Sequence, residues 1–575
     1  MATPAPPRGI GLPPVTPAVW LGVAALTLLA AGLRLTRLDH GGLWYDELIM
    51  ARITAQGWGV VWQEVMLARP PMYPLLGALW SSVFGDSDAA IRLLPALLSV
   101  ATVPPLFLVG RRLFGVRTGL LAAGLLAVSP FQVYYGQEHR YYALVMLLGV
   151  VSVGLMLRGL RLGESKETSG ASSGGSSAGG MRWGAWAGHG AASVLMLLTH
   201  PISAAILGPI GLAVIGLAVV GRLSRRRVMA FVAVQVGVGA AFVPWVAWKM
   251  AIAGSRIESG TLDEAGYVSW ITPTPWWAPV RTVGNFLFLG VKYLRADLML
   301  LAGLMLLAGL VVAAWRFGPR AAAGGWAKQL IDSVRRRASA WAVVGAWGVG
   351  PMLLLAAISW VATPLYVDRY IIASAAGLYL AVAAAAVAGS RVLPAWSVAG
   401  ALVLGMAGSL ATYYVAPQKG AWPEAAAWLD GRWSADEAWA FSSERGSPRE
   451  TEQVRGNWFW YAEAGRDAPR TDVDVRAEPA AVAAQLRAAA SGREALWLVL
   501  WRDTVAPVGL DETFAEPVAG VRLDRVERFF DLTLMRFVCD DGAEPGVELA
   551  ESVDPEHPRG ASGIGPGGDS PVVER

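Results

Sequence analysis

The sequence is short of charged residues. Of its 575 residues, 16% are charged and 54% are hydrophobic, and the mean hydropathy is +0.44. Soluble globular proteins carry roughly 25% charged residues, so this composition excludes an ordinary soluble enzyme. The 26 tryptophans exceed the need of a soluble core but suit aromatic belts at the two membrane–water interfaces. We therefore expect a polytopic membrane protein.

Cysteine and asparagine are almost absent. The single cysteine, Cys539, excludes an intrachain disulfide bond and any zinc or iron–sulfur site built from cysteines. Neither Asn285 nor Asn457 begins an Asn-x-Ser/Thr sequon, so nothing indicates N-glycosylation. Lysine is rare whereas arginine, alanine and glycine are abundant, a bias that is typical of a GC-rich bacterial genome. We expect a multi-pass protein of the bacterial inner (plasma) membrane.

Long apolar runs predict about eleven transmembrane helices, because a run of roughly 17–23 residues is needed to cross the ~30 Å hydrocarbon layer. The runs cover residues 18–36, 92–110, 118–135, 141–158, 183–199, 201–221, 228–248, 297–315, 340–361, 370–389 and 393–415. Cleavage of the first run as a signal peptide, after residues 30–32, is an alternative. We favour its retention, because the chemically unusual loop that follows needs anchoring.

The positive charges of the short loops predict the orientation, since Lys and Arg concentrate in cytoplasmic loops. Here they gather on one side, at Arg8, Arg111, Arg112, Arg117, Arg158, Arg161, Lys166, Arg182, Arg222, 225–227, Arg316, Arg320, Lys328, 335–337 and Arg391. The N-terminus is therefore expected in the cytoplasm and the segment after residue 415 outside. The Ser/Gly-rich stretch 164–180 falls in a cytoplasmic loop, and its composition is typical of a disordered linker.

The composition divides the chain into four parts. They are a cytoplasmic tail (1–17), a transmembrane domain (18–415) with long outer loops 37–91 and 249–296, an extracytoplasmic domain (416–540) and a disordered acidic tail (541–575). Apolar patterns in the outer domain predict helices at 422–433 and 479–490 and strands at 438–442, 495–501 and 529–538. The expected fold class is an all-α polytopic membrane domain with a small C-terminal α/β domain.

A carboxylate pair follows the first apolar run, in the motif Trp44-Tyr45-Asp46-Glu47. One interpretation is a solvated helix N-terminus, where the helix dipole favours acidic side chains. The other is a general base or metal ligand at the membrane boundary. The pair alone does not decide between them.

The outer turn of residues 129–142 is crowded with functional groups. It carries four tyrosines and, in succession, Glu138, His139 and Arg140. A plain turn needs only Gly, Pro or Asn, whereas ionisable groups at this depth are costly and by default indicate function.

Three further motifs face the same side of the membrane. Arg69 and Tyr73 flank a pair of prolines, which by itself reads as the entry to an interfacial helix. His200 closes an apolar run and is either a structural group or a ligand. Arg369 either extends its head group to the interface or binds phosphate, for which its planar fork is suited.

These scattered clusters converge at the outer membrane face. A carboxylate pair, a second acidic turn and several arginines at one lipid boundary suit a reaction on an amphiphile with an anionic head. We therefore expect a lipid-phosphate substrate whose phosphate is held by arginine, with or without a divalent cation.

The order of the motifs resembles that of bacterial GT-C glycosyltransferases, in particular those related to protein O-mannosyltransferases and lipid A aminoarabinose transferases. The motifs are Trp44-Tyr45-Asp46-Glu47, Pro70-Pro71-Met72-Tyr73, Tyr135-Gly136-Gln137-Glu138-His139-Arg140-Tyr141, Thr199-His200 and Asp368-Arg369-Tyr370. The likeness covers about residues 20–430, and the segment from Lys419 to Ala426 also resembles the post-membrane segment of such proteins. The C-terminal domain adds nothing specific to it.

The resemblance implies a polyprenyl-phosphate sugar as donor, cleaved on the outer side by an acceptor hydroxyl or amine. It implies that Asp46 acts as base or metal ligand, that Glu47 supports it and that Glu138 is the second acidic residue. A divalent ion such as Mg²⁺ or Mn²⁺ would have Asp46 and Glu138 as ligands. The expected substrate-binding residues are Arg69, Tyr73, His139, Arg140, Tyr141, His200, Arg369 and Tyr370. Arg69 departs from the family, where His often stands, which weakens a metal role there and adds a phosphate contact.

The expected chemistry follows from glycosyl transfer itself, which passes through an oxocarbenium-like state while the leaving phosphate gains negative charge. Arg140 and Arg369, or a bound cation, would stabilise that charge, and Asp46 would accept the acceptor's proton. A single displacement of this kind inverts the anomeric centre.

The sequence also fits other functions. A lipid or glycan transporter without covalent chemistry is the main alternative, although no internal repeat is evident and the ionisable groups lie at one face. A non-catalytic anchor for the outer domain is another. Asp472 and Asp474 form a lone DxD motif of nucleotide-sugar transferases, but the alternation also fits an exposed strand. No Gly-rich lysine loop of an ATP-driven transporter is present in the sequence.

Overall fold

The computed structural model describes most of the chain. The described residues are 16–67, 70–164, 181–258, 271, 273–289, 304, 307–308, 311–312, 319–389, 395–415, 419–443, 448–490, 492–493, 495–501 and 509–539. They fall into two compact units, of which the first comprises 1–432, 453–464 and 528–532 and the second the remainder. The expected linker, most of the expected span 297–315 and the expected acidic tail lie outside the described residues.

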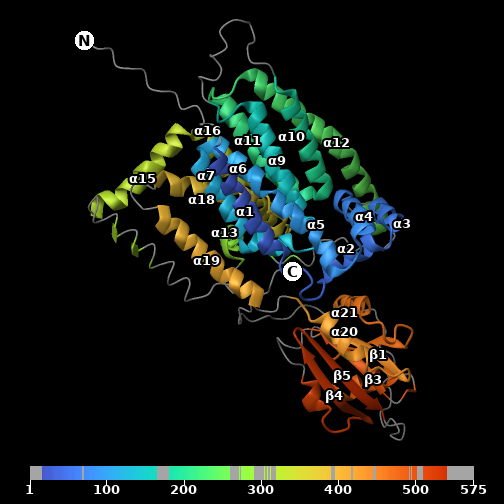
Figure 1. The fold of residues 1–575 in the computed structure, drawn as a ribbon. Coiled ribbons are helices and arrows are strands. Elements are labelled where there is room, and N and C mark those ends of the chain that lie inside the picture. The colour runs from blue at the N-terminus through green and yellow to red at the C-terminus, as the bar shows by residue number, and fades with distance from the viewer. Residues whose placement is uncertain are drawn as a thin grey trace, which may run out of the picture. The chain divides into compact units, whose positions relative to one another are not determined.

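The first unit is built of helices (Figure 1). They are α1 (Pro17–Leu35), α2 (Tyr45–Ala55), α3 (Trp58–Met66), α4 (Met72–Phe84), α5 (Asp88–Ala101), α6 (Val103–Phe114), α7 (Val116–Val128), α8 (Pro130–Gly136), α9 (Tyr142–Leu160), α10 (Trp183–Thr199), η2 (Pro201–Ser203), α11 (Ala204–Val219), α12 (Arg225–Glu258), α13 (Ala278–Phe288), α15 (Pro319–Arg336), α16 (Ala338–Gly348), α17 (Gly350–Val361), η4 (Asp368–Ile371), α18 (Ser374–Gly389), α19 (Ala395–Val415) and α20 (Trp422–Asp430). Most of the expected apolar runs are therefore helical.

Five helical stretches in the described residues are long and apolar enough to cross a membrane. They are Pro17–Leu35, Asp88–Phe114, Tyr142–Leu160, Pro201–Val219 and Arg225–Ser255. Two bent pairs, α7 with α8 and α16 with α17, raise the number to seven if each pair is one span. Helices α10 and α18, with 17 and 16 residues, are short for a membrane span, so the expected number of about eleven is not established.

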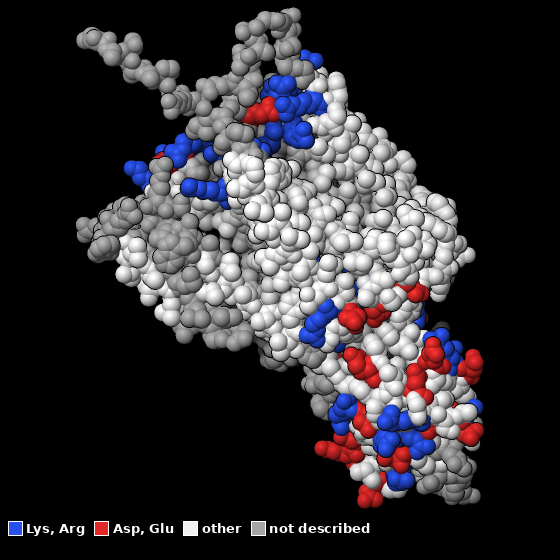
Figure 2. Space-filling model, viewed as in Figure 1, with Lys and Arg blue, Asp and Glu red and all other residues white. Residues whose placement is uncertain are grey.

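The visible surface of the helical unit agrees with a membrane location. Figure 2 shows a broad band with hardly any charged side chain, and Lys and Arg gathered at one end of it. Exposed leucines and valines such as Leu21, Leu212 and Val236 are consistent with contact to lipid.

The bend between α7 and α8 is stabilised by a buried arginine from α1. Pro130 has no N–H and begins α8 after a 56° change of direction, so carbonyl groups at the end of α7 lose their helical donors. The guanidinium of Arg34 donates to the carbonyl oxygens of Ala127 (2.8 Å) and Leu126 (2.9 Å), and its Nε donates to Ser99 Oγ (2.7 Å). The bend directs residues 137–142 to the functional site.

Two glycines allow helices α16 and α18 to approach closely. A Cβ on Gly348 of α16 would lie 2.8 Å from the backbone nitrogen of Leu378, and one on Gly377 of α18 would lie 2.5 Å from the nitrogen of Gly348. Small residues at such contacts let helix backbones pack where lipid supplies no hydrophobic driving force.

The second unit contains most of a five-stranded sheet of order β2-β1-β3-β5-β4, with helices beside it (Figure 1). Its elements are β1 (Glu437–Ser443), β2 (Arg470–Asp472), α22 (Pro479–Ala490), β3 (Ala495–Trp501), α23 (Leu510–Thr513), β4 (Val521–Phe529) and β5 (Leu532–Cys539), with the end of β4 and the start of β5 counted in the first unit. Helix α21 (Pro448–Tyr461) begins in the second unit, and from residue 453 onward it belongs to the first. Strand β1 pairs in parallel with β2 and β3, with Trp439 opposite both Arg470 and Trp497.

The helices and strands expected at 422–433, 479–490, 438–442 and 495–501 are confirmed. The strand expected at 529–538 is wrong at its start, because residues 530 and 531 form a turn between β4 and β5. Asp531 adopts a positive φ of 60° in that turn, a conformation that apolar periodicity does not reveal.

Candidate functional site

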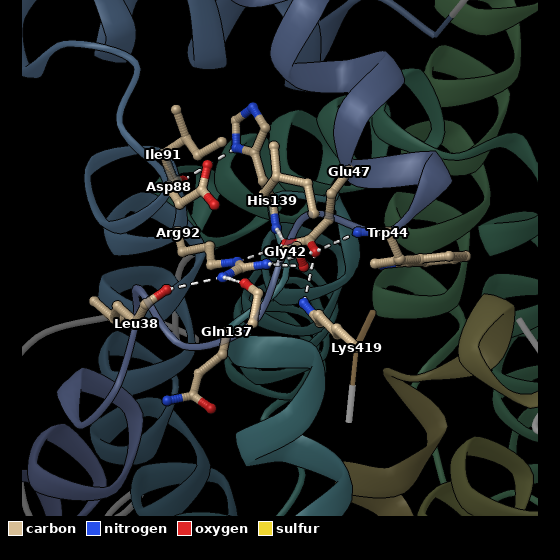
Figure 3. A network of polar contacts seen from close by, with 12 residues as sticks. Leu38, Gly42, Trp44, Glu47, Asp88, Ile91, Arg92, Gln137, His139 and Lys419 are labelled. Atoms are coloured by element: carbon tan, nitrogen blue, oxygen red, sulfur yellow. Dashed lines mark hydrogen bonds and ion pairs between the residues drawn. The ribbon is translucent and has the colours of Figure 1, made fainter. Parts of the chain in front are cut away.

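Glu47 is the centre of a buried polar network (Figure 3). It lies in the first turn of α2, where its Oε2 accepts from the backbone N–H of Trp44 (3.4 Å) and so satisfies a free donor at the helix start. Its carboxylate also accepts from the guanidinium of Arg92, with Nε–Oε1 at 3.0 Å and Nη2–Oε2 at 3.1 Å. The side chain is fully buried, so this bidentate pair is shielded from water.

Arg92 uses its whole guanidinium within the network. Besides Glu47, it donates to the backbone carbonyl oxygens of Leu38 (3.0 Å), Gly41 (3.1 Å) and Gly42 (3.0 Å). These carbonyls belong to the loop between α1 and α2, which has no regular structure of its own. Arg92 therefore holds the loop in place and leaves no donor for a substrate.

Lys419 completes the network from the segment after α19. Its Nζ lies 2.6 Å from Oε2 of Glu47, and both side chains are at least nine-tenths buried. Burial alone would raise the pKa of Glu47, but Arg92 and Lys419 hold it well below its usual range. Glu47 is therefore a permanent anion whose two oxygens are both occupied.

The turn between α8 and α9 is fixed to the same carboxylate. The backbone N–H of His139 donates to Oε1 of Glu47 (2.9 Å). Its buried imidazole lies 3.1 Å from the Ile91 carbonyl oxygen through Nδ1 and 3.3 Å from the Thr54 hydroxyl through Nε2, with Tyr73 beside it. Burial lowers the pKa of His139 to about 4. Because a carbonyl only accepts, Nδ1 carries the proton, and His139 is a neutral structural group.

Glu138 is fully buried and differs from Glu47 in its surroundings. Among the described residues, no hydrogen bond of good geometry ends on either of its oxygens. Burial raises the pKa of Glu138 to about 7. The positive charges of Lys419 and Arg369 lower this pKa, whereas the negative charge of Glu47 raises it. The Tyr134 hydroxyl offsets only a small part of this effect. Glu138 is thus a carboxyl that can exchange a proton near neutral pH.

Asp46 and Arg140 form the more accessible part of the site. Nη1 of Arg140 donates to the backbone oxygen of Asp46 (3.1 Å), and its Nη2 lies 3.8 Å from the carboxylate. The Asp46 side chain is 29% exposed, unlike that of its neighbour Glu47. A carboxylate that is reachable and oriented by an arginine is suited to contact a substrate.

Aromatic rings surround the two arginines. The guanidinium of Arg140 lies 5.0 Å from the ring centroid of Tyr141, and that of Arg369 lies 5.9 Å from Trp44 and 5.7 Å from Tyr370. His200 stacks on Tyr141 at 4.5 Å and 19° and contacts Tyr370 at 4.7 Å. Burial lowers the pKa of His200 to about 3, so no cationic imidazole competes with the arginines.

Asp368 positions Arg369 through backbone and side-chain hydrogen bonds. Its Oδ1 accepts from the backbone N–H of Arg369 (3.1 Å), and its Oδ2 accepts from Asn285 of α13 (2.5 Å). These bonds connect η4 to α13 and so fix where the Arg369 side chain begins.

The structure brings most of the expected residues together. Asp46, Glu138, Arg140, Tyr141, His200, Arg369 and Tyr370 form one neighbourhood, while Glu47, Tyr73 and His139 lie buried behind it. Arg69 lies outside the described residues. Arg92 and Lys419 were not expected in the site, although an arginine at the start of an otherwise apolar run was the signal that could have revealed Arg92.

The described residues contain no group of three or more His, Cys, Asp or Glu side chains that could together hold a metal ion. If Asp46 and Glu138 bound a metal ion, water and substrate would fill most of its coordination positions. Mg²⁺ tolerates this arrangement and a structural zinc ion does not.

The Asp472-Val473-Asp474 triplet, which the sequence analysis also interpreted as an exposed strand, has a structural explanation. Asp472 ends β2, Val473 is buried, and Asp474 accepts from the backbone N–H of Arg476 (3.0 Å). The alternation of the DxD motif is therefore that of a strand end followed by a turn.

Comparison with solved structures finds several matches at low sequence identity. The chain is similar to ArnT from Cupriavidus metallidurans in the apo state, with 14% identity, 90% of this chain and 97% of that chain covered, and a TM-score of 0.49. The same protein bound to undecaprenyl phosphate gives 14% identity, coverage of 90% and 98%, and a TM-score of 0.48. The oligosaccharyltransferase AglB from Archaeoglobus fulgidus, in complex with an inhibitory peptide and a dolichol-phosphate, gives 13% identity, coverage of 87% and 71%, and a TM-score of 0.42.

Comparison by sequence identifies one family. Residues 68–172 match the model of the dolichyl-phosphate-mannose-protein mannosyltransferase family. No curated protein sequence matches the chain. The matched segment includes α4 and the turn that carries Glu138 and Arg140, and it confirms the resemblance to GT-C glycosyltransferases.

Proposed function

We propose that the protein is a membrane glycosyltransferase that moves a sugar from a polyprenyl-phosphate donor to a lipid, glycan or protein acceptor. The observation that carries this proposal is the arrangement of Asp46, Arg140 and Arg369. A partly exposed carboxylate lies beside one arginine, and a second arginine is packed on aromatic rings in the same neighbourhood. An attacking hydroxyl and a lipid phosphate are the two groups that this arrangement suits.

The reaction takes place on the outer face in this proposal. About eleven spans, as the apolar runs suggest, place the N-terminus in the cytoplasm of a bacterium and the segment 416–540 outside its inner membrane. The concentration of Lys and Arg at one end of the helical unit supports this orientation (Figure 2). The motifs at residues 44–47, 135–141 and 368–370 then lie at the opposite face.

Arg140 and Arg369 hold the donor phosphate. When the bond between the anomeric carbon and the phosphate oxygen breaks, the oxygen keeps both electrons and the phosphate gains charge. Arginines packed against aromatic rings stabilise that charge more strongly than bulk water would, because little solvent screens them. The rings of Tyr141, His200 and Tyr370, which contact one another, provide an apolar wall for the donor.

Asp46 is the general base. It takes the proton of the acceptor hydroxyl or amine as this group attacks the anomeric carbon from the side opposite the leaving phosphate. One displacement inverts the anomeric configuration, so a product with retained configuration, measured by NMR, would rule this step out.

Glu47 and Glu138 act differently from Asp46. Glu47 holds the loop, the 137–142 turn and Lys419 together, and it positions Asp46 from the adjacent residue. Glu138 sets the charge beside Arg369, since its carboxyl exchanges a proton near neutral pH. Tyr73 and His139 support this turn from behind.

Donor cleavage tests the proposal. Purified protein is incubated with a radiolabelled polyprenyl-phosphate sugar, beside the Asp46→Asn variant and the control Asp86→Asn, which removes an exposed carboxylate of the same outer loop. We expect sugar release by the native protein and the control, and a loss of at least 100-fold in Asp46→Asn, the usual scale for a general base. Equal release by all three proteins would remove Asp46 from the chemistry.

A transporter for lipid-linked sugars is the second candidate, because the same arginines would bind a lipid phosphate without cleaving it. It predicts that vesicle-reconstituted protein moves the donor across the bilayer while every sugar stays attached. The exposed carboxylate beside Arg140 favours the transferase, since phosphate binding alone gains nothing from a nearby anion.

A further inference from the structure

A cavity lies within the first unit, beside the loop between α1 and α2 and the segment that follows α19. It has a volume of about 250 Å³. Its lining includes Arg37, His40, Arg92, Lys419 and the aromatic side chains of Tyr413 and Phe529. None of the residues expected from the sequence to bind substrate lines it.

The charge of the lining favours an anion. The lining contains three basic side chains, those of Arg37, Arg92 and Lys419, and one carboxylate, that of Glu424. Positive charge remains in excess even when the buried Glu47 behind the wall is included. Burial, followed by the charge of Arg37, lowers the pKa of His40, so His40 is a neutral hydrogen-bonding group rather than a fourth cation.

Lys419 offers unused donors to this cavity. An ammonium has three N–H groups, yet in the described part of the chain its only hydrogen-bond acceptor is Oε2 of Glu47. The Lys419 side chain is 9% exposed, so its remaining donors lie where bulk water has little access. An acceptor atom in the cavity would satisfy them.

Close backbone contacts fix the position of Lys419. The N–H of Gly42 donates to the carbonyl oxygen of Gly420 (3.2 Å), and a Cβ on Gly42 would lie 2.8 Å from Cδ1 of Trp422. A Cβ on Gly41 would lie 3.4 Å from that of Lys419. The segment after α19 therefore packs directly on the loop before α2, which holds the ammonium at the cavity wall.

Arg37 is held at the rim in an unusual conformation. Its φ is +60°, in the left-handed region that a residue with a Cβ rarely adopts, and its guanidinium contacts the Tyr414 carbonyl oxygen and the His40 ring. Strained residues that surrounding contacts keep in place are often found at binding sites. Here the strain directs an exposed cation over the cavity.

We propose that this cavity binds the anionic head of the acceptor, a phosphate or carboxylate carried on a sugar-sized group. The inference rests on the proposed transferase function and assigns the acceptor class that it left open. The volume is at the small end for ligand pockets, so a head group fits and a whole lipid does not. The aromatic walls suit the apolar face of a sugar ring, and Lys419 and Arg37 bind its anionic substituent.

Binding of soluble probes tests the proposal without relying on activity. The full-length protein is titrated with glucuronate, glucose 1-phosphate and, as the neutral control, glucose. We expect the two anions to bind and glucose to bind at least tenfold more weakly, because a charge-assisted hydrogen bond is lost. Equal affinity for glucose and its 1-phosphate would overturn the proposal.

Two variants locate the binding. Arg37→Gln removes an exposed cation of the rim and should weaken anion binding about tenfold without affecting folding. Arg222→Gln makes the same change at an exposed arginine between α11 and α12 and should leave it unchanged. Binding that is insensitive to Arg37→Gln, or sensitive to both variants, would contradict the assignment.

A competition experiment distinguishes a lipid acceptor from a soluble or polymeric one. Nanodiscs that contain an anionic phospholipid should displace glucuronate if the acceptor is a lipid, and neutral nanodiscs should not. A soluble or polymeric acceptor predicts no displacement by either, and the proposal stands in both cases provided the anions bind.

Donor cleavage without anion binding would reject this inference alone, and anion binding without donor cleavage would reject the proposed function alone.

Discussion

At the scale of single residues, the two adjacent carboxylates of α2 show how environment assigns roles. Asp46 is partly exposed and touches one arginine, whereas Glu47 is buried with Arg92, Lys419 and two backbone N–H groups. The sequence predicted a functional role for the pair. It did not predict that Glu47 is the member held in ion pairs, because its partners Arg92 and Lys419 are 45 and 372 residues away. Spacing along the chain carries no information about such distant partners.

Removing Arg92 should destabilise the protein. The Arg92→Met variant leaves Glu47 buried with one counter-charge and frees three loop carbonyl groups, which should lower the free energy of unfolding by about 3–5 kcal/mol. Thermal unfolding in detergent measures this change. The control Arg222→Gln should be unaffected, and an Arg92→Met protein as stable as the native one would show that the network does not hold the loop.

Glu138 should make stability depend on pH. Its folded pKa of about 7 lies above the value for an unfolded chain, so the stabilising contribution is present below pH ~4.5 and is lost as the pH rises through 7. The Glu138→Gln variant lacks this loss and should gain up to about 3 kcal/mol relative to the native protein between pH 4.5 and 8. A difference in unfolding free energy between the two proteins that stays constant over that pH range would contradict the raised pKa. The matched control is Glu463→Gln, which changes an exposed glutamate.

At the scale of elements, apolar periodicity predicted helices more reliably than it predicted their breaks. The run 118–135 is helical but is bent by 56° at Ser129–Pro130, and the run 340–361 is bent by 42° where α17 begins. The first bend depends on Arg34 from another helix and the second accompanies close glycine contacts. Both depend on tertiary neighbours that hydropathy does not report.

The glycine contact between α16 and α18 should be intolerant of a methyl group. Gly348→Ala places a Cβ 2.8 Å from the Leu378 nitrogen and should destabilise the protein by about 1–3 kcal/mol. Gly345→Ala, in the same helix, has nothing within 4 Å of the new Cβ and should be neutral or slightly stabilising. Equal melting temperatures of the two variants would show that the helices can separate at little cost.

At the scale of the whole molecule, the composition predicted a membrane protein with a small α/β part. The orientation expected from the charge distribution stays a prediction. The match of residues 68–172 supports the family resemblance. Hydropathy predicted more spans than the five to seven found among the described residues, because several helices of the bundle are shorter than a membrane crossing and most of the expected span 297–315 lies outside those residues.

Cysteine labelling tests the orientation. The only native cysteine is removed as Cys539→Ala, and single cysteines are introduced as Arg222→Cys and Asp436→Cys, both at exposed positions. A membrane-impermeant reagent should label the second in intact cells and the first only after permeabilisation. The reverse pattern would invert the topology and place the site in the cytoplasm.

Asp46, Arg140 and Arg369 are proposed to form a site for a lipid phosphate. The decisive measurement is the dissociation constant of polyprenyl phosphate for the native protein, Asp46→Asn and Arg369→Gln. We expect binding at least tenfold weaker in Arg369→Gln, and equal or tighter in Asp46→Asn because a nearby negative charge is removed. Equal binding by all three proteins, or binding by none, would show that these residues do not hold the phosphate.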